Sequence, residues 1–97
     1  MQLKIPHKYS KDEALARVKK ALEDGKSQLA GKATIDQEEW QGDTLHFAFT
    51  AQGQSISGTL TVEDKQFDLY AKLPLMLKFF EGKIEAAIAE QAKQMLE

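Results

Sequence analysis

The strongest constraint on the fold is a run of alternating apolar and polar residues that short turns interrupt. The alternation falls in three segments, residues 44–50, 55–63 and 67–73. A period of two residues is typical of strands with one buried face, and turns this short join antiparallel neighbours. The run therefore predicts an antiparallel meander with one apolar and one polar face.

Two further strands are expected beside this meander. Residues 2–8 alternate, but Pro6 has no N–H group to donate, which indicates a strand at a sheet edge. Residues 34–40 form the weakest candidate, because three of their seven side chains are acidic. Of these, Glu38 and Glu39 should point to opposite faces of the strand.

Two helices complete the pattern. The first begins after Ser10, which forms a capping box with Glu13, and ends near Gly31. Its apolar stripe consists of Ala14, Leu15, Val18, Ala21, Leu22 and Leu29. A second helix is expected over residues 75–96, directly after Pro74. Its stripe consists of Leu77, Phe80, Ile84, Ile88 and Met95.

The order of elements is β-α-β-β-β-β-α, which predicts an α+β fold in one domain, residues 1–97. Both helices should lie on the apolar face of one curved antiparallel sheet, because that face needs a cover. The expected core consists of Leu45, Phe47, Ile56, Leu60, Val62, Leu69, Phe80, Ile84 and Ile88.

Composition excludes several classes of function. The chain has no cysteine, so it has no disulfide, thiolate nucleophile or cysteine zinc site, and a reducing, cytoplasmic location is expected. Residues 1–10 hold no apolar stretch of signal-peptide length, and no segment approaches the ~20 apolar residues of a membrane span. The net charge of −2 favours no nucleic-acid partner.

The sequence offers no catalytic or metal-binding constellation. His7 and His46 are the only histidines, and neither has a second ligand at metal-binding spacing. We expect His7 to be a partly buried, hydrogen-bonded residue, although a hydrolase or isomerase that uses it stays as an alternative. We predict that the chain is not an enzyme and has no catalytic, cofactor-binding or metal-binding residues.

Three residues are candidates for an interface. Trp40 ends a polar strand, where it either closes the rim of the core or anchors a partner. The start of the last helix carries more apolar side chains than one helix face can bury. Met76 and Phe79 are therefore expected either in a wide core contact or on a surface for a partner or lipid.

Three motifs in order resemble the polyhydroxyalkanoic acid system family of bacterial proteins. They are Ile5-x-His7-x-x-Ser10-x-x-Glu13-Ala14, Trp40-x-Gly42-Asp43-x-Leu45-x-Phe47 and Gly58-x-Leu60-x-Val62. The resemblance implies an association with polyester storage granules, and it brings no defined catalytic residues. The layout is also similar to a reduced helix-grip fold, in which a curved sheet wraps a long helix.

The leading hypothesis is an accessory protein that binds a partner protein, such as a granule-associated protein, or the hydrophobic granule surface. The alternative is a carrier of a small apolar ligand, with a pocket between the sheet and the C-terminal helix. A homodimer built from the start of the last helix, the strand that ends at Trp40, or both is also expected, because open sheet edges and apolar patches favour association.

Overall fold

A computed structural model describes residues 1–96, except the side chains of Leu29, Met95 and Leu96. The predicted contributions of Leu29 and Met95 to the two apolar stripes therefore lie outside the described part of the chain. In order, the elements are β1 (Gln2–Pro6), α1 (Lys11–Leu29), β2 (Thr34–Gln41), β3 (Thr44–Ala51), β4 (Gln54–Val62), β5 (Gln66–Lys72), α2 (Leu75–Lys78) and α3 (Glu81–Leu96).

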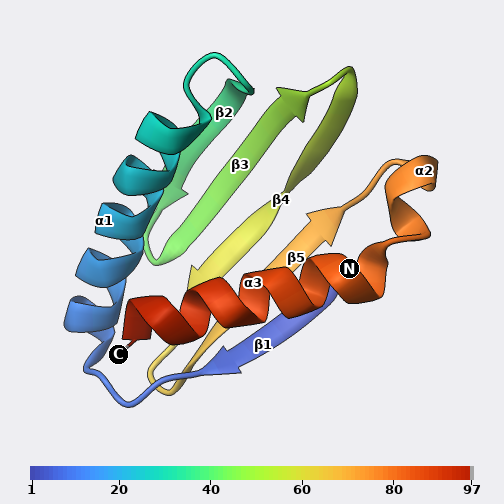
Figure 1. Cartoon of the computed structure of the whole chain (residues 1–97). Helices are drawn as coiled ribbons and strands as arrows, with labels where there is room; N and C mark the ends of the chain where they lie inside the picture. Colours follow the sequence, from blue (N-terminus) through green and yellow to red (C-terminus); the bar gives the residue numbers. More distant parts are fainter. Residues whose placement is uncertain (97) are drawn as a thin grey trace.

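The five strands form one antiparallel sheet in the order β1-β5-β4-β3-β2 (Figure 1). The meander from β2 to β5 is confirmed, and so is the place of β1 at an edge. β1 pairs with β5, so the first and last strands of the chain are neighbours. The predicted α+β class is confirmed.

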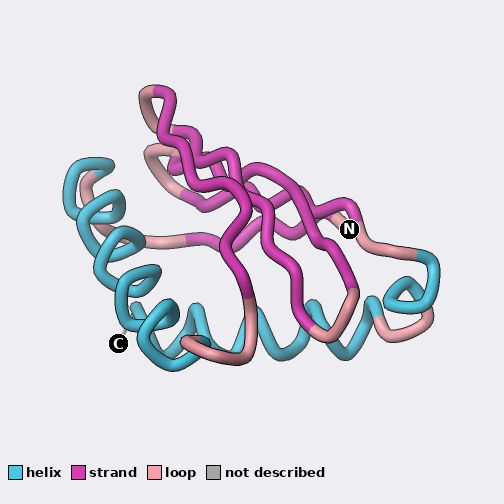
Figure 2. The backbone as a smooth tube through the Cα atoms, turned by 90° about the horizontal axis from the view of Figure 1, so that it is seen from above, coloured by secondary structure: helices cyan, strands magenta, loops and turns pink. Residues whose placement is uncertain are grey.

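The helices lie on one side of the sheet (Figure 2). Ala14 and Val18 of α1 pack against Val62 and Phe67, and α3 crosses the same side of the sheet above β1 and β5. The N-terminus of α1 is capped as expected, because Ser10 Oγ accepts a hydrogen bond from the Glu13 N–H at 3.2 Å. The chain turns away after the helix at Gly31, whose φ of +81° suits glycine.

The expected single C-terminal helix is wrong, because it is broken into α2 and α3 at Phe79 and Phe80. The Phe80 N–H bonds to the Leu77 carbonyl at 3.0 Å, and the Ile84 N–H bonds to the Phe80 carbonyl at 2.9 Å. The first of these hydrogen bonds ends α2, and the second forms the first turn of α3. The break changes the direction of the chain and separates the apolar start of the predicted helix from the rest.

The register of the strands aligns the residues of the apolar face in rows across the sheet. Leu45, Leu60 and Leu69 are neighbours across β3, β4 and β5. In the next row, Gly58 lies between Phe47 and Ala71, where β4 approaches β5 closely. A Cβ atom at Gly58 would overlap the Tyr70 carbonyl oxygen and lie 2.8 Å from Ala71 Cα. This position therefore requires glycine.

A β-bulge in β2 shifts the pairing between Ile35 and Gln37. Beyond the bulge, Glu38 pairs with Phe47 and Trp40 pairs with Leu45, so both lie on the apolar face. The pairing from the turn to Gln37 is unbroken, so the hairpin register places Glu38 on the face that the rest of the sheet keeps apolar, and the bulge brings Ile35 to the same face opposite Phe49.

The buried core is smaller than predicted and lies at one end of the sheet. It centres on Ala14, Val18, Val62 and Phe67, with Leu60 and Trp40 among the half-buried residues around it. Of the nine expected core residues, Leu45 and Val62 are buried, and six are half-buried, namely Phe47, Ile56, Leu60, Leu69, Ile84 and Ile88. Phe80 is wrong as a core residue, since 53% of it is exposed, because the helix break turns it away from the sheet.

Candidate functional site: an exposed apolar turn and an apolar groove

The most exposed large apolar side chains of the described residues gather around α2. Leu75, Met76, Phe79 and Phe80 are exposed by 73%, 67%, 82% and 53%, and we call these four residues the α2 patch. Two of the three predicted interface residues, Met76 and Phe79, belong to it. Contiguous apolar exposure of this kind marks interaction sites more often than isolated apolar residues do.

Local sequence explains why the patch projects. Pro74 follows the last strand, and its carbonyl accepts hydrogen bonds from the Leu77 and Lys78 N–H groups at 3.0 and 3.1 Å. These bonds form a single helical turn, in which Leu77 alone is half-buried. The turn stands at a corner of the molecule, away from the sheet and from α1 (Figure 1).

The surroundings of the α2 patch are basic. Residues 72–83 contain Lys72, Lys78 and Lys83, all exposed, against a single acidic residue, Glu81. The carboxylate of Glu81 forms an ion pair with the Met1 ammonium group at 3.1 Å. The patch therefore combines exposed aromatic and aliphatic side chains with a positive rim.

A second apolar feature is an open groove of about 260 Å³ between the C-terminal half of α1 and the sheet. Its apolar walls are Leu22, Ile35, Phe47, Phe49, Leu60 and Leu69. A wider recess of about 750 Å³ continues from it between α1 and α3, and the two share Leu22, Leu60 and Leu69. Ile84, which we expected beside Phe47 and Leu60, lines neither space.

Two ion pairs connect α1 to the β2–β3 hairpin. Lys11 contacts Asp43 at 2.8 Å, and Lys26 forms an ion pair with Glu38 at the mouth of the groove. The hydrogen bond to Asp43 raises the pKa of Lys11, and the hydrogen bond to Glu38 raises the pKa of Lys26. Lys26 and Glu38 both line the groove, so their ion pair spans its mouth, whereas the pair of Lys11 and Asp43 lies at the other end of α1.

Trp40, the third predicted interface residue, lies away from the α2 patch. It is half-buried at the margin of the core, and the Lys19 ammonium group lies 5.2 Å from the centroid of its ring. A cation at this distance is attracted by the ring face. The structure therefore does not bring Trp40 together with Met76 and Phe79.

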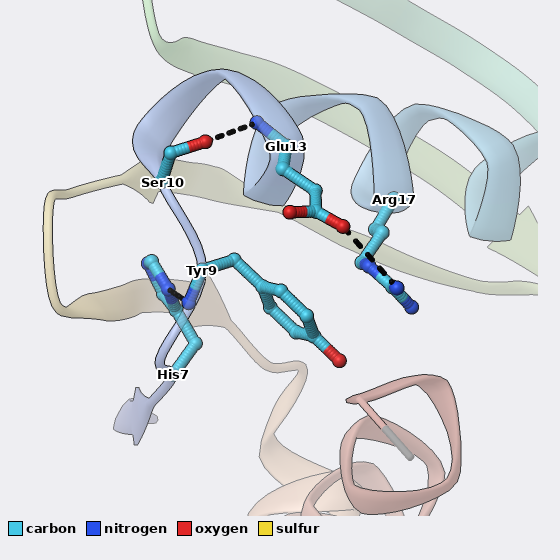
Figure 3. A network of polar contacts seen from close by, with 5 residues as sticks. All are labelled: His7, Tyr9, Ser10, Glu13 and Arg17. Atoms are coloured by element: carbon cyan, nitrogen blue, oxygen red, sulfur yellow. Dashed lines mark hydrogen bonds and ion pairs between the residues drawn. The ribbon is translucent and has the colours of Figure 1, made fainter.

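His7 is part of a polar network at the corner between β1 and α1 (Figure 3). It is 8% exposed, and its Nδ1 accepts a hydrogen bond from the Tyr9 N–H at 3.2 Å. Nε2 therefore carries the proton and donates it to the Glu63 carbonyl at 2.8 Å. Both ring nitrogens are bound to backbone atoms, which confirms the prediction of a partly buried, hydrogen-bonded histidine.

The same network continues along α1. The Arg17 guanidinium lies 4.1 Å from the centroid of the Tyr9 ring and contacts the Glu13 carboxylate at 3.4 Å. These contacts connect the capped first turn of the helix to the segment that leaves β1 (Figure 3). These contacts all join residues of the fold to one another, which is typical of a structural network.

Sequence reasoning missed the groove wall formed by Ile35 and the inward position of Glu38. Ile35 carried a signal, because it is a β-branched residue on an otherwise polar strand. Glu38 shares the face of Trp40 by alternation, but an acidic side chain gives no sign of an inward position. Leu75 and Phe80 belong to the same apolar segment from which Met76 and Phe79 were predicted as interface residues.

In the part of the chain that the structure describes, no group of three or more histidine, aspartate or glutamate side chains could hold a metal ion. Within the same residues, no helix combines the length and the apolar character needed to cross a bilayer.

Comparison with known proteins gives one match. The model of the family described as "Putative polyhydroxyalkanoic acid system protein (PHA_gran_rgn)" covers residues 1–96. No curated protein and no solved structure matches the chain. Since the match spans nearly the whole sequence and agrees with the resemblance of the three motifs, the chain belongs to the polyhydroxyalkanoic acid system family.

Proposed function

We propose that this chain is a non-enzymatic accessory protein of a polyhydroxyalkanoate system, and that it attaches to the hydrophobic surface of the polyester through the α2 patch. The observation that carries the proposal is the exposure of Phe79, 82%, beside Leu75 and Met76. The family name supplies the context, because it links the chain to polyhydroxyalkanoates. Such a protein acts in the cytoplasm, where the polymer is stored.

Physical chemistry supports a surface contact through this turn. Each buried Å² of apolar surface contributes about 25 cal/mol, so side chains that are largely exposed before contact have much to gain. A compact polyester presents apolar groups and ester carbonyls. Lys72 and Lys78 lie beside the patch and can donate hydrogen bonds to those carbonyls while the apolar side chains make contact.

The test is co-sedimentation with protein-free polyhydroxybutyrate particles. We expect the wild-type chain to bind and Phe79→Asp to lose at least about tenfold in affinity, because a charge replaces the most exposed ring. The matched control is Tyr70→Asp, since Tyr70 is a 51% exposed aromatic residue on β5 and lies outside the α2 patch.

Two results would contradict the surface proposal. One is equal binding by Phe79→Asp and Tyr70→Asp. The other is binding to native granules without binding to protein-free particles, which would indicate a granule protein as the partner.

A second candidate function rests on a separate observation, the groove of about 260 Å³ with apolar walls that include Phe47 and Leu60. A pocket with these walls suits a carrier of a small apolar ligand. Titration with a medium-chain fatty acid, followed by calorimetry, tests this candidate. We expect Leu60→Glu to abolish binding if the groove holds the ligand, whereas heat release that is unchanged in this variant would exclude the groove.

A further inference from the structure

A single copy of the chain leaves two apolar features uncovered, and they have opposite shapes. The α2 patch projects from one corner of the molecule. The groove is recessed, and its outer wall, Ile35, is 44% exposed on the edge strand β2. Both features cost free energy while they face water, so an arrangement that covers each with the other is favoured.

We propose that two copies of the chain associate reciprocally, with the α2 patch of each copy inserted into the groove of the other. This inference goes beyond attachment to polyester, because it concerns the protein away from any surface. It also regulates that attachment, since the α2 patch is covered in the dimer and has to leave the groove before it can contact polyester.

Charge complementarity favours a second copy as the occupant of the groove. β2, which forms the outer side of the groove, carries Asp36, Glu38 and Glu39 and has no basic residue. Lys26 neutralises Glu38 by their ion pair, so Asp36 and Glu39 leave a net charge of −2 on this edge. Residues 72–83, which carry the α2 patch, have a net charge of +2. Insertion of the patch brings these opposite charges together and steers the encounter of the two copies.

Size and placement agree with this occupant. A cavity of about 150 Å³ accepts one benzene ring, so a groove of about 260 Å³ has room for the ring of Phe79 with one aliphatic neighbour. The turn at α2 and the start of β2, which carries the groove wall Ile35, lie at opposite sides of the same end of the sheet (Figure 1). A two-fold axis between them brings each α2 patch to the other copy's groove, which gives a closed dimer.

Variants on the two features make the reciprocal contact testable by sedimentation at micromolar concentration. Phe79→Asp removes the inserted ring, and Ile35→Asp charges the groove wall. In a homodimer of either variant, both reciprocal contacts contain the substituted residue. We therefore expect the dissociation constant of each variant to rise at least about 100-fold. Tyr70→Asp, a charge at an exposed aromatic residue outside both features, should associate as the wild type does. Circular dichroism checks that each variant is folded.

An equimolar mixture of Phe79→Asp and Ile35→Asp is the decisive sample. In the mixture, the intact α2 patch of Ile35→Asp can enter the intact groove of Phe79→Asp, so a heterodimer with one contact should form although neither variant forms a homodimer. A mixture that stays monomeric would mean a patch-to-patch contact or none and would overturn the proposal. A monomeric wild type over the same concentrations would overturn it as well.

The same variants separate this inference from the proposed function. Ile35→Asp keeps its α2 patch, so it should bind protein-free polyester at least as well as the wild type does, because no dimer competes for the patch. Loss of polyester binding by every sample, with the association pattern intact, would refute the surface function and leave the dimer. Polyester binding that Phe79→Asp loses, without the association pattern, would refute the dimer alone.

Discussion

The two halves of α1 meet the sheet in different ways. In the N-terminal half, Ala14 and Val18 pack directly against Val62 and Phe67, and all four side chains are nearly inaccessible. In the C-terminal half, Lys26 reaches Glu38 of β2 by an ion pair at the mouth of an open groove. We expect the first, the packed half, to supply more of the stability of the fold than the second. The second, the open half, leaves apolar surface free for binding, as does the α2 patch.

The largest effect should come from the centre of the packed half. Phe67 is 2% exposed, so Phe67→Ala should lower the free energy of unfolding by about 3–5 kcal/mol, through lost burial and a residual cavity. Phe79→Ala is the matched change at the α2 patch and should cost under about 0.5 kcal/mol, because Phe79 is 82% exposed. Urea denaturation measures both, and equal losses would erase the distinction between the two regions.

The next effect should come from Gly58, in the middle of β4 between Phe47 and Ala71. Gly58→Ala would place a Cβ atom against the backbone of Tyr70 and Ala71, which forces β4 and β5 apart. We expect a loss of about 1–3 kcal/mol by urea denaturation, as for other overpacked sites. Gly25→Ala is the control, since a Cβ atom there meets no neighbouring atom. A neutral Gly58→Ala would show that the strands do not approach as closely as described.

A smaller effect should come from the cap of α1. Ser10→Ala removes the acceptor of the Glu13 N–H and should cost about 1 kcal/mol in unfolding free energy. Ser10→Asp restores an acceptor and should recover most of the loss. If the alanine variant is as stable as the wild type, the packed half does not depend on the beginning of this helix.

The smallest effect concerns the ion pair above the groove. Glu38 raises the pKa of Lys26, so the ion pair contributes stability below the usual lysine pKa of 10.5 and loses it as pH rises through the raised value. The difference in unfolding midpoint between the wild type and Glu38→Gln should therefore vanish at high pH and shrink in high salt. Glu39→Gln serves as the control, and a difference that persists in strong alkali would exclude the ion pair as its cause.

Periodicity was sufficient to predict most of the sheet. The alternation of Leu45, Phe47 and Phe49 set the apolar face of β3 correctly, and Pro6 correctly marked an edge. Such signals are local, because a strand shows its buried face in its own sequence. The hydrogen-bonded state of His7 was also predicted, although the strand expected over residues 2–8 ends at Pro6 and His7 lies directly after it.

The features that sequence could not predict depend on how elements meet. The stripe of the last helix continued through Phe79 and Phe80, so nothing in its period indicated the break there. The inward position of Ile35 required the bulge at residues 35–37, and the partner of the inward Glu38 is Lys26 on a different element, α1. The apolar excess near Met76 was visible, but its exposure depended on the direction the chain takes after Pro74.

The pairing of β1 with β5 has a consequence for the order in which the chain can fold. Gln2 lies opposite Tyr70, so β1 can pair only after β5, the last strand of the meander, is present. The strands β2 to β5, in contrast, pair with their sequence neighbours through hairpins. Contacts between residues so distant along the chain slow folding. At a synthesis rate of about 5–20 residues per second, β1 spends several seconds outside the ribosome before β5 exists. We expect the nascent hairpins to form first and the N-terminal strand to join last.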